Sequence, residues 1–380
     1  MKTSPKSLPL RSLVLAAFVS TGFDLPAMHA ADAAPTVAKP AINAPVTIAD
    51  GADAWVIDNG IVKATVQKKN GKMTSLVYQG QETLTRNSES WEQLATGTVT
   101  QAVTIDPATN GGARAEVAVK GVTGRMDIEL RYTLERGVSG FYTYGIYSHG
   151  ANYPAAGEGE SRFINQLSSN FDWLSVDADR NMPMCSNADT RSGVVIHAKE
   201  QRILSTGIYK NSVEHKYSYT GVQFETPAYG WSSVKDHIGV WFINPTIEYL
   251  SGGASKCELD VHLGDNDDPD PILLDYWRGT HYGGGAPGNI AEGEEWTKVV
   301  GPIFVYVNSL SQAQETTPEE LAALQATQGD PKVPASWTAN QTALWQDALA
   351  QAKTERAAWP YDWVNGVDYP HKDQRGEVDR

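Results

Sequence analysis

The chain is poor in several features that usually define a protein class. Of its 380 residues only 2 are cysteine, and 31 Lys and Arg stand against 45 Asp and Glu. Proteins that bind nucleic acid need a basic surface, so this acidic composition argues against such a partner. The sequence has no phosphate-binding loop, no Gly-x-Ser-x-Gly elbow and no His-Glu-x-x-His zinc motif. We therefore expect neither a cofactor nor a catalytic metal.

Long apolar runs are missing too, which argues against a membrane-spanning segment. The N-terminus has a basic start, a short apolar core at Leu13–Val19 and small residues around Ala30. This order is typical of an export signal. We predict a signal peptide over 1–34, a flexible leader over 35–46, and a secreted protein, extracellular or periplasmic, without a membrane partner.

The two cysteines, Cys185 and Cys257, show no metal-binding spacing. In an oxidising compartment they could form a disulfide, and two free buried thiols are the alternative. The sequence leaves both open.

From residue 54 onward the pattern is that of β-strands. Short apolar runs at Ala54–Ile57, Ile61–Val66 and Met73–Tyr78 are separated by Asn-Gly turns, as in a meander. Asp127–Leu134 alternates polar and apolar residues, which predicts a strand with one wet face. We predict an all-β fold, a large antiparallel sandwich over 47–310.

Helical signals come late in the chain. Ile272–Arg278, stopped by Gly279, predicts a short helix. Thr317-Pro-Glu-Glu320 is a good helix start, and a further helix is predicted over 338–358. We assign 311–358 to a helical extension. Residues 359–380 contain no complete element and read as a linker.

The most unusual stretch is Tyr209–Tyr219, with two lysines, a histidine, a glutamate and three tyrosines. A continuous strand over 210–218 would place Lys210, Glu214 and Lys216 on one polar face. Neighbouring like charges lower the pKa of a lysine, so that a neutral fraction can accept a proton. The alternative is a solvated sheet edge whose charges serve solubility.

Two further segments invite a functional interpretation. His281 precedes a tyrosine and a triple glycine, which would let a bulky ligand approach, and a histidine can donate a proton near neutral pH; an ordinary loop histidine is the alternative. The acidic run Asp265–Asp270 could bind Ca²⁺ but lacks the spacing of a calcium loop, so a solvated turn is favoured and no metal is assigned.

Three stretches together resemble the rhamnogalacturonan lyases of polysaccharide lyase family 4. They are Glu160–Leu167, His215–Ser218 and Asp275–His281. The resemblance implies a galactose mutarotase-like super-sandwich as the catalytic domain. In the family a fibronectin type III-like domain and a jelly-roll domain usually follow. On this reading 359–380 begins a fibronectin type III-like domain that is missing.

The resemblance also assigns roles. Lys216 matches the family's catalytic base, His281 its acid, and Arg162 its substrate-binding arginine. Leu274 stands where the family has a tyrosine, which puts that contact in doubt. The further expected substrate contacts are Lys210, Tyr217, Tyr219, Tyr276, Trp277 and Arg278.

The implied reaction is β-elimination at the rhamnose–galacturonate bond of rhamnogalacturonan I. Lys216 would remove the C5 proton, Arg162 would neutralise the charge that builds on the carboxylate, and His281 would protonate the leaving O4. The implied partner is this pectin polysaccharide, bound by a monomer. Two alternatives remain: a mutarotase-like epimerase on the same fold and a non-catalytic carbohydrate-binding protein.

Overall fold

The computed structural model describes most of the chain. The described ranges are 33–85, 90–197, 201–250, 256–260, 271–278, 288–326 and 329–376. At 90, 158, 216, 217, 256–260 and 288 only the backbone is described. Nearly all of the predicted signal peptide, the run Asp265–Asp270 and His281 lie outside these ranges.

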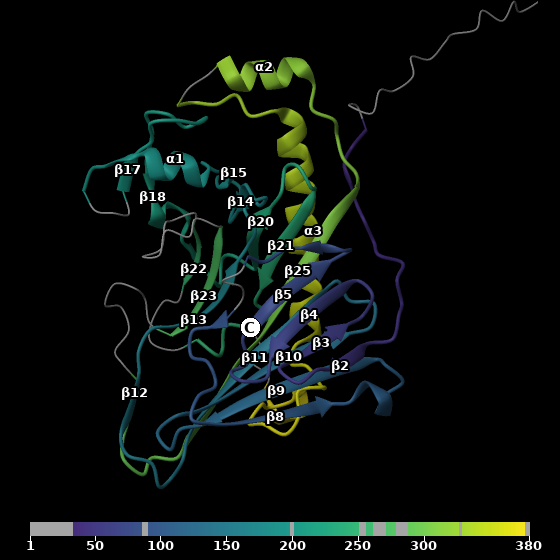
Figure 1. Ribbon diagram of the computed structural model, residues 1–380, viewed down its shortest axis with the longest axis vertical. Helices are drawn as coiled ribbons and strands as arrows, with labels where there is room; N and C mark the ends of the chain where they lie inside the picture. The colour runs from purple at the N-terminus through teal and green to yellow at the C-terminus, as the bar shows by residue number, and fades with distance from the viewer. Residues whose placement is uncertain are drawn as a thin grey trace, which may run out of the picture.

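One large antiparallel sheet forms the centre of the molecule (Figure 1). Its strands in spatial order are β15 (Asn181–Pro183), β14 (Trp173–Ser175), β20 (Ala228–Ser232), β21 (Ile238–Ile243), β25 (Trp296–Gln312), β11 (Gly140–His149), β10 (Asp127–Glu135), β9 (Arg114–Val122) and β8 (Thr98–Ile105). All of β20 and β21 is buried, because other elements cover both faces of the sheet there.

Two smaller sheets of five strands pack against the large one. The first is the predicted meander with its two flanking strands: β2 (Thr47–Asp50), β3 (Ala54–Asp58), β4 (Val62–Gln67), β5 (Met73–Tyr78) and β6 (Gln81–Glu82). The second runs in the order β19 (Gly221–Val222), β22 (Lys256–Asp260), β23 (Ile272–Arg278), β13 (Ser161–Gln166) and β7 (Ser90–Trp91). Side chains of all three sheets share one apolar core, so the predicted antiparallel sandwich is confirmed.

The turn between β3 and β4 shows why the meander could be predicted. Asn59 is fully buried, and its side-chain oxygen accepts hydrogen bonds from the backbone of Ile61 (3.0 Å) and Val62 (2.9 Å). Gly60 has a φ of +82°, a conformation that favours glycine. The Asn-Gly pair therefore favours the reversal through local chemistry, and the Asn59 amide nitrogen adds hydrogen bonds to the Glu135 and Val138 carbonyls.

The opposite face of the large sheet is covered by the long helix α3 (Ala335–Ala358), seen behind the strands in Figure 1. Leu344, Ala348 and Ala352 recur every four residues and form its buried stripe. They join a second core with the outward-facing aromatic rings of β11, β21 and β25. The segment after the helix, from Trp359 on, packs on this core through Tyr361, Val364 and Tyr369.

A shorter helix, α2 (Pro318–Ala326), begins as predicted. Thr317 Oγ1 accepts a hydrogen bond from the Glu320 backbone (3.2 Å), and Glu320 Oε2 accepts one from the Thr317 backbone (3.0 Å). This reciprocal pair is a capping box. Among the described helices, none is long and apolar enough to cross a membrane.

The prediction of a helix over Ile272–Arg278 was wrong. This segment is β23, paired with β13 on one side and with β22 on the other. Leu273–Trp277 are all buried, as expected of a strand covered on both faces. A short apolar run does not distinguish a buried strand from a buried helix, and here the pairing with two distant strands decided.

The expectation of one strand over 210–218 was also wrong. Asn211 has a φ of +72°, which interrupts an extended chain. Only Val213–His215 forms a strand, β18, and a 3₁₀ turn, η3 (Lys216–Tyr219), follows at once. With β16 (Val194–Val195) and β17 (Gln201–Ile203), β18 makes a small separate sheet beside helix α1 (Asn187–Ser192).

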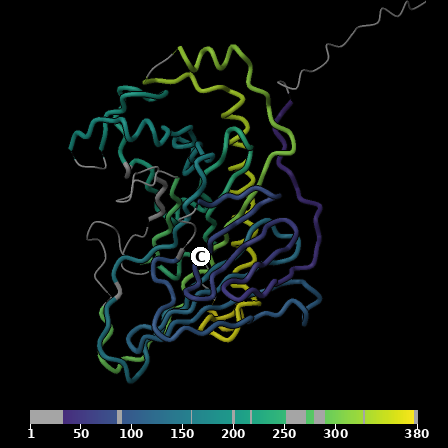
Figure 2. The backbone as a smooth tube through the Cα atoms, in the orientation of Figure 1, coloured from purple at the N-terminus to yellow at the C-terminus, as the bar shows by residue number. Residues whose placement is uncertain are grey.

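The remaining elements are short. They are β1 (Thr36–Val37), β12 (Ala156–Glu158), β24 (Gly288–Ile290), η2 (Pro107–Thr109) and η4 (Lys372–Gln374). β1 falls within the expected leader and pairs with the end of β25, where Figure 2 shows the purple start of the chain beside the green segment.

A buried ion pair lies on the outer face of the large sheet. Arg131 Nη1 donates to Glu116 Oε1 at 3.1 Å, and both side chains are less than a tenth exposed. The Glu116 carboxylate also accepts hydrogen bonds from Thr133 and Tyr144, each at 2.7 Å. Removing one partner would leave the other charge buried without its counter-ion.

We predict that Arg131→Met lowers the free energy of unfolding by about 3 kcal/mol, because Glu116 then stays charged in a buried site. Urea denaturation monitored by tryptophan fluorescence measures the change. The matched control is Arg125→Met, at an exposed position, which should change stability by less than about 0.5 kcal/mol. Equal effects of the two variants would contradict the role of the buried pair.

Candidate active site

The pairing of β13 with β23 brings Arg162 opposite Tyr276. Along β13, Ser161, Phe163 and Asn165 are buried, while Arg162 and the alternate residues that follow it are half-buried. Arg162 therefore lies on the sheet face that points away from the main core, and Tyr276 shares that face. Leu274, which replaces the second tyrosine of the family, pairs with Ile164 two positions along the same face.

The Arg162 guanidinium is already engaged by protein groups. Nε and Nη2 contact the two carboxylate oxygens of Glu92, at 3.1 Å and 2.8 Å. Nη1 lies 3.2 Å from Glu160 Oε1 and 3.4 Å from the Tyr276 hydroxyl. Burial disfavours the charge, but Glu92 and Tyr276 together outweigh burial and raise the pKa of Arg162. The guanidinium is thus a permanent cation held between two carboxylates.

Two of the predicted aromatic contacts are core residues instead. The Trp277 side chain points to the opposite face from Tyr276, is 1% exposed, and has its ring 4.6 Å from that of Tyr147. Tyr219 is 8% exposed, and its hydroxyl donates to Glu214 at 2.9 Å. Neither ring offers a face for stacking on a sugar. Sequence spacing did not reveal this, because it does not show which side of a sheet is covered.

The other predicted residues lie around this sheet. Tyr276 is likewise only 1% exposed, and its hydroxyl accepts a hydrogen bond from Arg162 at 3.4 Å. Arg278 is half-buried at the end of β23 and pairs in register with Ser161. Lys210 is half-buried just before β18, and its backbone carbonyl lies near Gly329.

The segment that carries Lys216 enters the same sheet. The backbone of Lys216 and Tyr217 belongs to η3, which lies against β22 and leads directly into β19. β19 pairs with β22, and β22 pairs with β23. Strand spacing places β19 about 14 Å from β13, on the far side of β22 and β23. The side chains of Lys216 and Tyr217, and all of His281, lie outside the described residues.

A buried polar cluster fixes the turn around Lys216. The hydrogen bond from Tyr219 to Glu214 joins the last residue of the η3 turn to the middle of β18, the strand that precedes the turn. Burial raises the pKa of Glu214 to about 7, and the Cys185 thiol is nearby. Tyr209 donates a hydrogen bond to the Pro183 carbonyl at 2.6 Å and anchors the start of the segment that carries β18 and η3.

Cys185 is a free, buried thiol. Its sulfur lies 3.4 Å from the Thr190 hydroxyl, and burial raises the pKa of the thiol to about 12, so it is unreactive. The structure thus agrees with the free-thiol alternative at this position. The side chain of Cys257 lies outside the described residues.

Behind Tyr276 lies a second buried acid, Asp275, which is fully inaccessible. Burial raises the pKa of Asp275 to about 7. The Tyr249 hydroxyl lies 3.1 Å from Asp275 Oδ2 and 2.6 Å from Asn244 Oδ1. One hydroxyl proton serves only one of these acceptors, and a protonated Asp275 can donate to the Tyr249 oxygen while Tyr249 donates to Asn244.

Sequence analysis missed several charged residues of this region. Glu92 directly follows β7, 70 residues before Arg162, and Glu160 directly precedes β13. Lys298, on β25 opposite Tyr147, has its pKa lowered by burial and by the charge of Arg278. Nothing in their local sequence distinguishes them from ordinary surface charges, because only strand pairing brings them to the site.

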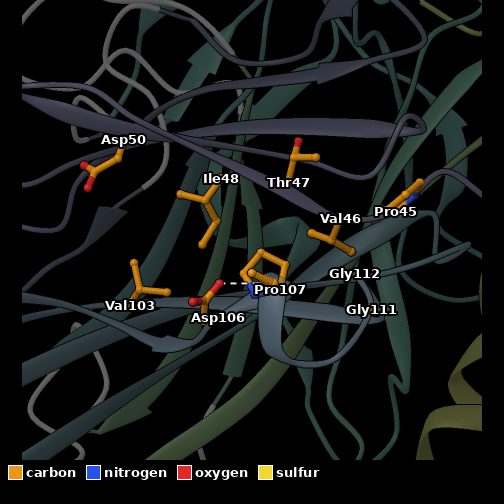
Figure 3. Close-up of a pocket in the computed structure, with 11 residues that line it drawn as sticks. Pro45, Val46, Thr47, Ile48, Asp50, Val103, Asp106, Pro107, Gly111 and Gly112 are labelled. Carbon is orange, nitrogen blue, oxygen red and sulfur yellow. Dashed lines mark hydrogen bonds between the residues drawn. The ribbon is translucent and has the colours of Figure 1, made fainter.

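A groove of about 580 Å³ lies elsewhere, between β2 and the turn after β8 (Figure 3). Its lining is mostly apolar, with Val46, Ile48, Val103 and Pro107, and Asp50 and Asp106 at its rim. It contains no residue of β13 or β23. Within the described ranges, no three His, Cys, Asp or Glu side chains converge as metal ligands.

The fold and this arrangement define an antiparallel β-sandwich protein with an arginine–carboxylate cluster on one sheet face. Residues 113–210 match the rhamnogalacturonate lyase family, which confirms the resemblance predicted from the sequence. The matched region includes Arg162 and ends before Lys216. A rhamnogalacturonate lyase from Dickeya dadantii is 26% identical over 250 residues, or 66% of this chain. The chain spans 35% of that relative's length.

Solved structures of sugar-modifying proteins are similar at low identity. A galactose mutarotase-like protein from Lactobacillus casei is 7% identical, with a TM-score of 0.36 over 69% of this chain and 99% of that one. A galactose mutarotase related enzyme from Lactobacillus acidophilus is 7% identical, with a TM-score of 0.35 over 70% and 99%.

The titration of Asp275 yields a prediction for stability. An unfolded aspartate titrates near pH 4, as in model peptides, whereas in the folded protein the proton is kept up to about pH 7. Between these values the folded state binds more protons than the unfolded state. The stability that this group contributes is therefore complete below pH 4 and is lost as the pH rises through 7.

Asp275→Asn cannot ionise, so the decline in unfolding free energy between pH 4 and pH 8 should be smaller than in the parent protein. Urea midpoints measured at several pH values test this. Asp362→Asn, at an exposed position, serves as the control and should leave the pH profile unchanged. A profile for Asp275→Asn that parallels the parent would refute the interpretation.

Proposed function

We propose that this chain is the catalytic β-sandwich of a rhamnogalacturonan lyase, which cleaves the rhamnose–galacturonate bond of the pectin backbone by β-elimination. The observation that carries the proposal is the similarity to a rhamnogalacturonate lyase over 66% of the chain. The position of Arg162 on a sheet that also receives η3 supports it, because the reaction needs a cation and a base at one sugar.

The chemistry assigns one task to each group. Galacturonate carries its C5 proton next to a carboxylate, and removal of that proton increases the negative charge on the carboxylate oxygens. A fixed guanidinium such as Arg162 stabilises that charge, and it remains protonated at every working pH. Lys216, when neutral, accepts the proton, and His281, when protonated, gives one to O4 as the rhamnose leaves.

The geometry supports a site that extends across several strands. Arg162 lies on β13, and the turn of Lys216 leads into β19, with β22 and β23 between them. A polymeric substrate would then lie across the strands.

Incubation with de-esterified rhamnogalacturonan I should produce an unsaturated uronide, seen as rising near-ultraviolet absorbance. Lys216→Ala and His281→Ala should each reduce this rate by at least about 100-fold, the usual contribution of a general base or acid. Circular dichroism checks that the fold persists. Lys235→Ala, at an exposed turn position, is the matched lysine control and should keep full activity.

No absorbance change with the parent protein would refute the proposal. Binding of the polysaccharide without new absorbance would instead identify a non-catalytic carbohydrate-binding protein. Full activity of Lys216→Ala would exclude this lysine as the base and direct attention to Lys298, the half-buried lysine beside Arg278.

A further inference from the structure

We propose that Glu92 is a specificity-determining residue that occupies Arg162 in the ligand-free protein and is exchanged for the carboxylate of an acidic sugar. The inference rests on the proposed function only in that the ligand is a uronate. It concerns binding, so it can be tested separately from cleavage.

The backbone of Glu92 is fixed by the sheet, whereas its carboxylate is partly exposed. Its N–H donates to the Arg162 carbonyl at 2.9 Å, and the preceding Trp91 is paired in register with Phe163. The Trp91 ring is fully buried, and its Nε1 donates to Thr143 at 3.0 Å. The Glu92 side chain, in contrast, is 30% exposed, so the carboxylate can leave Arg162 without disturbing the strand.

The guanidinium offers few donors for an additional ligand. Arg has five N–H groups, and its Nε–Nη2 and Nη1–Nη2 edges each present a fork of two parallel donors that matches a carboxylate. The Nε–Nη2 edge is the one that Glu92 occupies here, with both of its carboxylate oxygens. Glu160 and Tyr276 contact Nη1, on the other edge. A substrate carboxylate therefore gains the two-point contact at the Nε–Nη2 edge by displacing Glu92.

Charge makes this exchange selective. Arg162 together with Glu92 and Glu160 carries a net charge of one negative unit. This charge repels an acidic sugar as long as both glutamates stay in place. A neutral sugar gains nothing from the fork and leaves Glu92 in place. A uronate replaces one carboxylate by another, so the cation stays paired throughout. Glu92 thereby lowers the affinity for an acidic sugar, but it also holds the Arg162 guanidinium in the orientation that binds one.

Isothermal titration calorimetry with a rhamnogalacturonan oligosaccharide tests the exchange, using the free acid and the same oligosaccharide after reduction of its carboxyl groups. Glu92→Gln should bind the acidic oligosaccharide about two- to fivefold more tightly than the parent protein, the range expected for one partly exposed ion pair. Its affinity for the reduced oligosaccharide should not change. The gain in affinity should shrink at high salt, because screening weakens the ion pairs that Arg162 forms with Glu92 and with the sugar carboxylate.

Glu135→Gln is the matched control, since it removes a comparable ion pair with Arg114 on the large sheet. It should alter neither affinity. Glu92→Ala provides a second variant should Glu92→Gln fail to fold. Weaker or unchanged acidic binding in both Glu92 variants would overturn the exchange, as would a parent protein that binds no acidic oligosaccharide. Binding that follows the expected pattern without any unsaturated product would sustain the exchange and refute the lyase.

Discussion

The antiparallel pairing of β13 with β23 is the constraint on which the candidate site depends. It joins residues 114 positions apart, and it decides that Arg162 meets Tyr276. The same pairing turns Phe163 and Trp277 into the main core, where their burial stabilises the sheet. A shift of the register by one residue would exchange these faces, so apolar burial fixes the position of the cation.

Charged groups near this sheet are arranged in two different ways. On the face away from the core, Arg162 is matched by Glu92 and Glu160, and all three remain partly exposed. Asp275, directly beside Tyr276, is buried with hydroxyl and amide neighbours, and it avoids the cost of a buried charge by keeping its proton. The first arrangement leaves a cation that ligands can reach, and the second holds the strand in place.

Much of the fold could be predicted because its signals are local. The turn at Asn59 and Gly60 and the capping box at Thr317 and Glu320 are made by residues within three positions of each other. The two faulty assignments have different causes. Ile272–Arg278 takes its conformation from pairing with β13, far away in the sequence, whereas the stretch at 210–218 is interrupted by the positive φ at Asn211.

By itself the sequence determined the antiparallel sandwich, the late helices and the short motifs that relate the chain to rhamnogalacturonate lyases. These follow from periodicity, turn chemistry and the order of a few conspicuous residues. Only the tertiary structure decided that Trp277 and Tyr219 are core residues and that Glu92 holds Arg162. The physical reason is that burial and ion pairing are set by which strands become neighbours, and neighbouring strands here lie tens of residues apart.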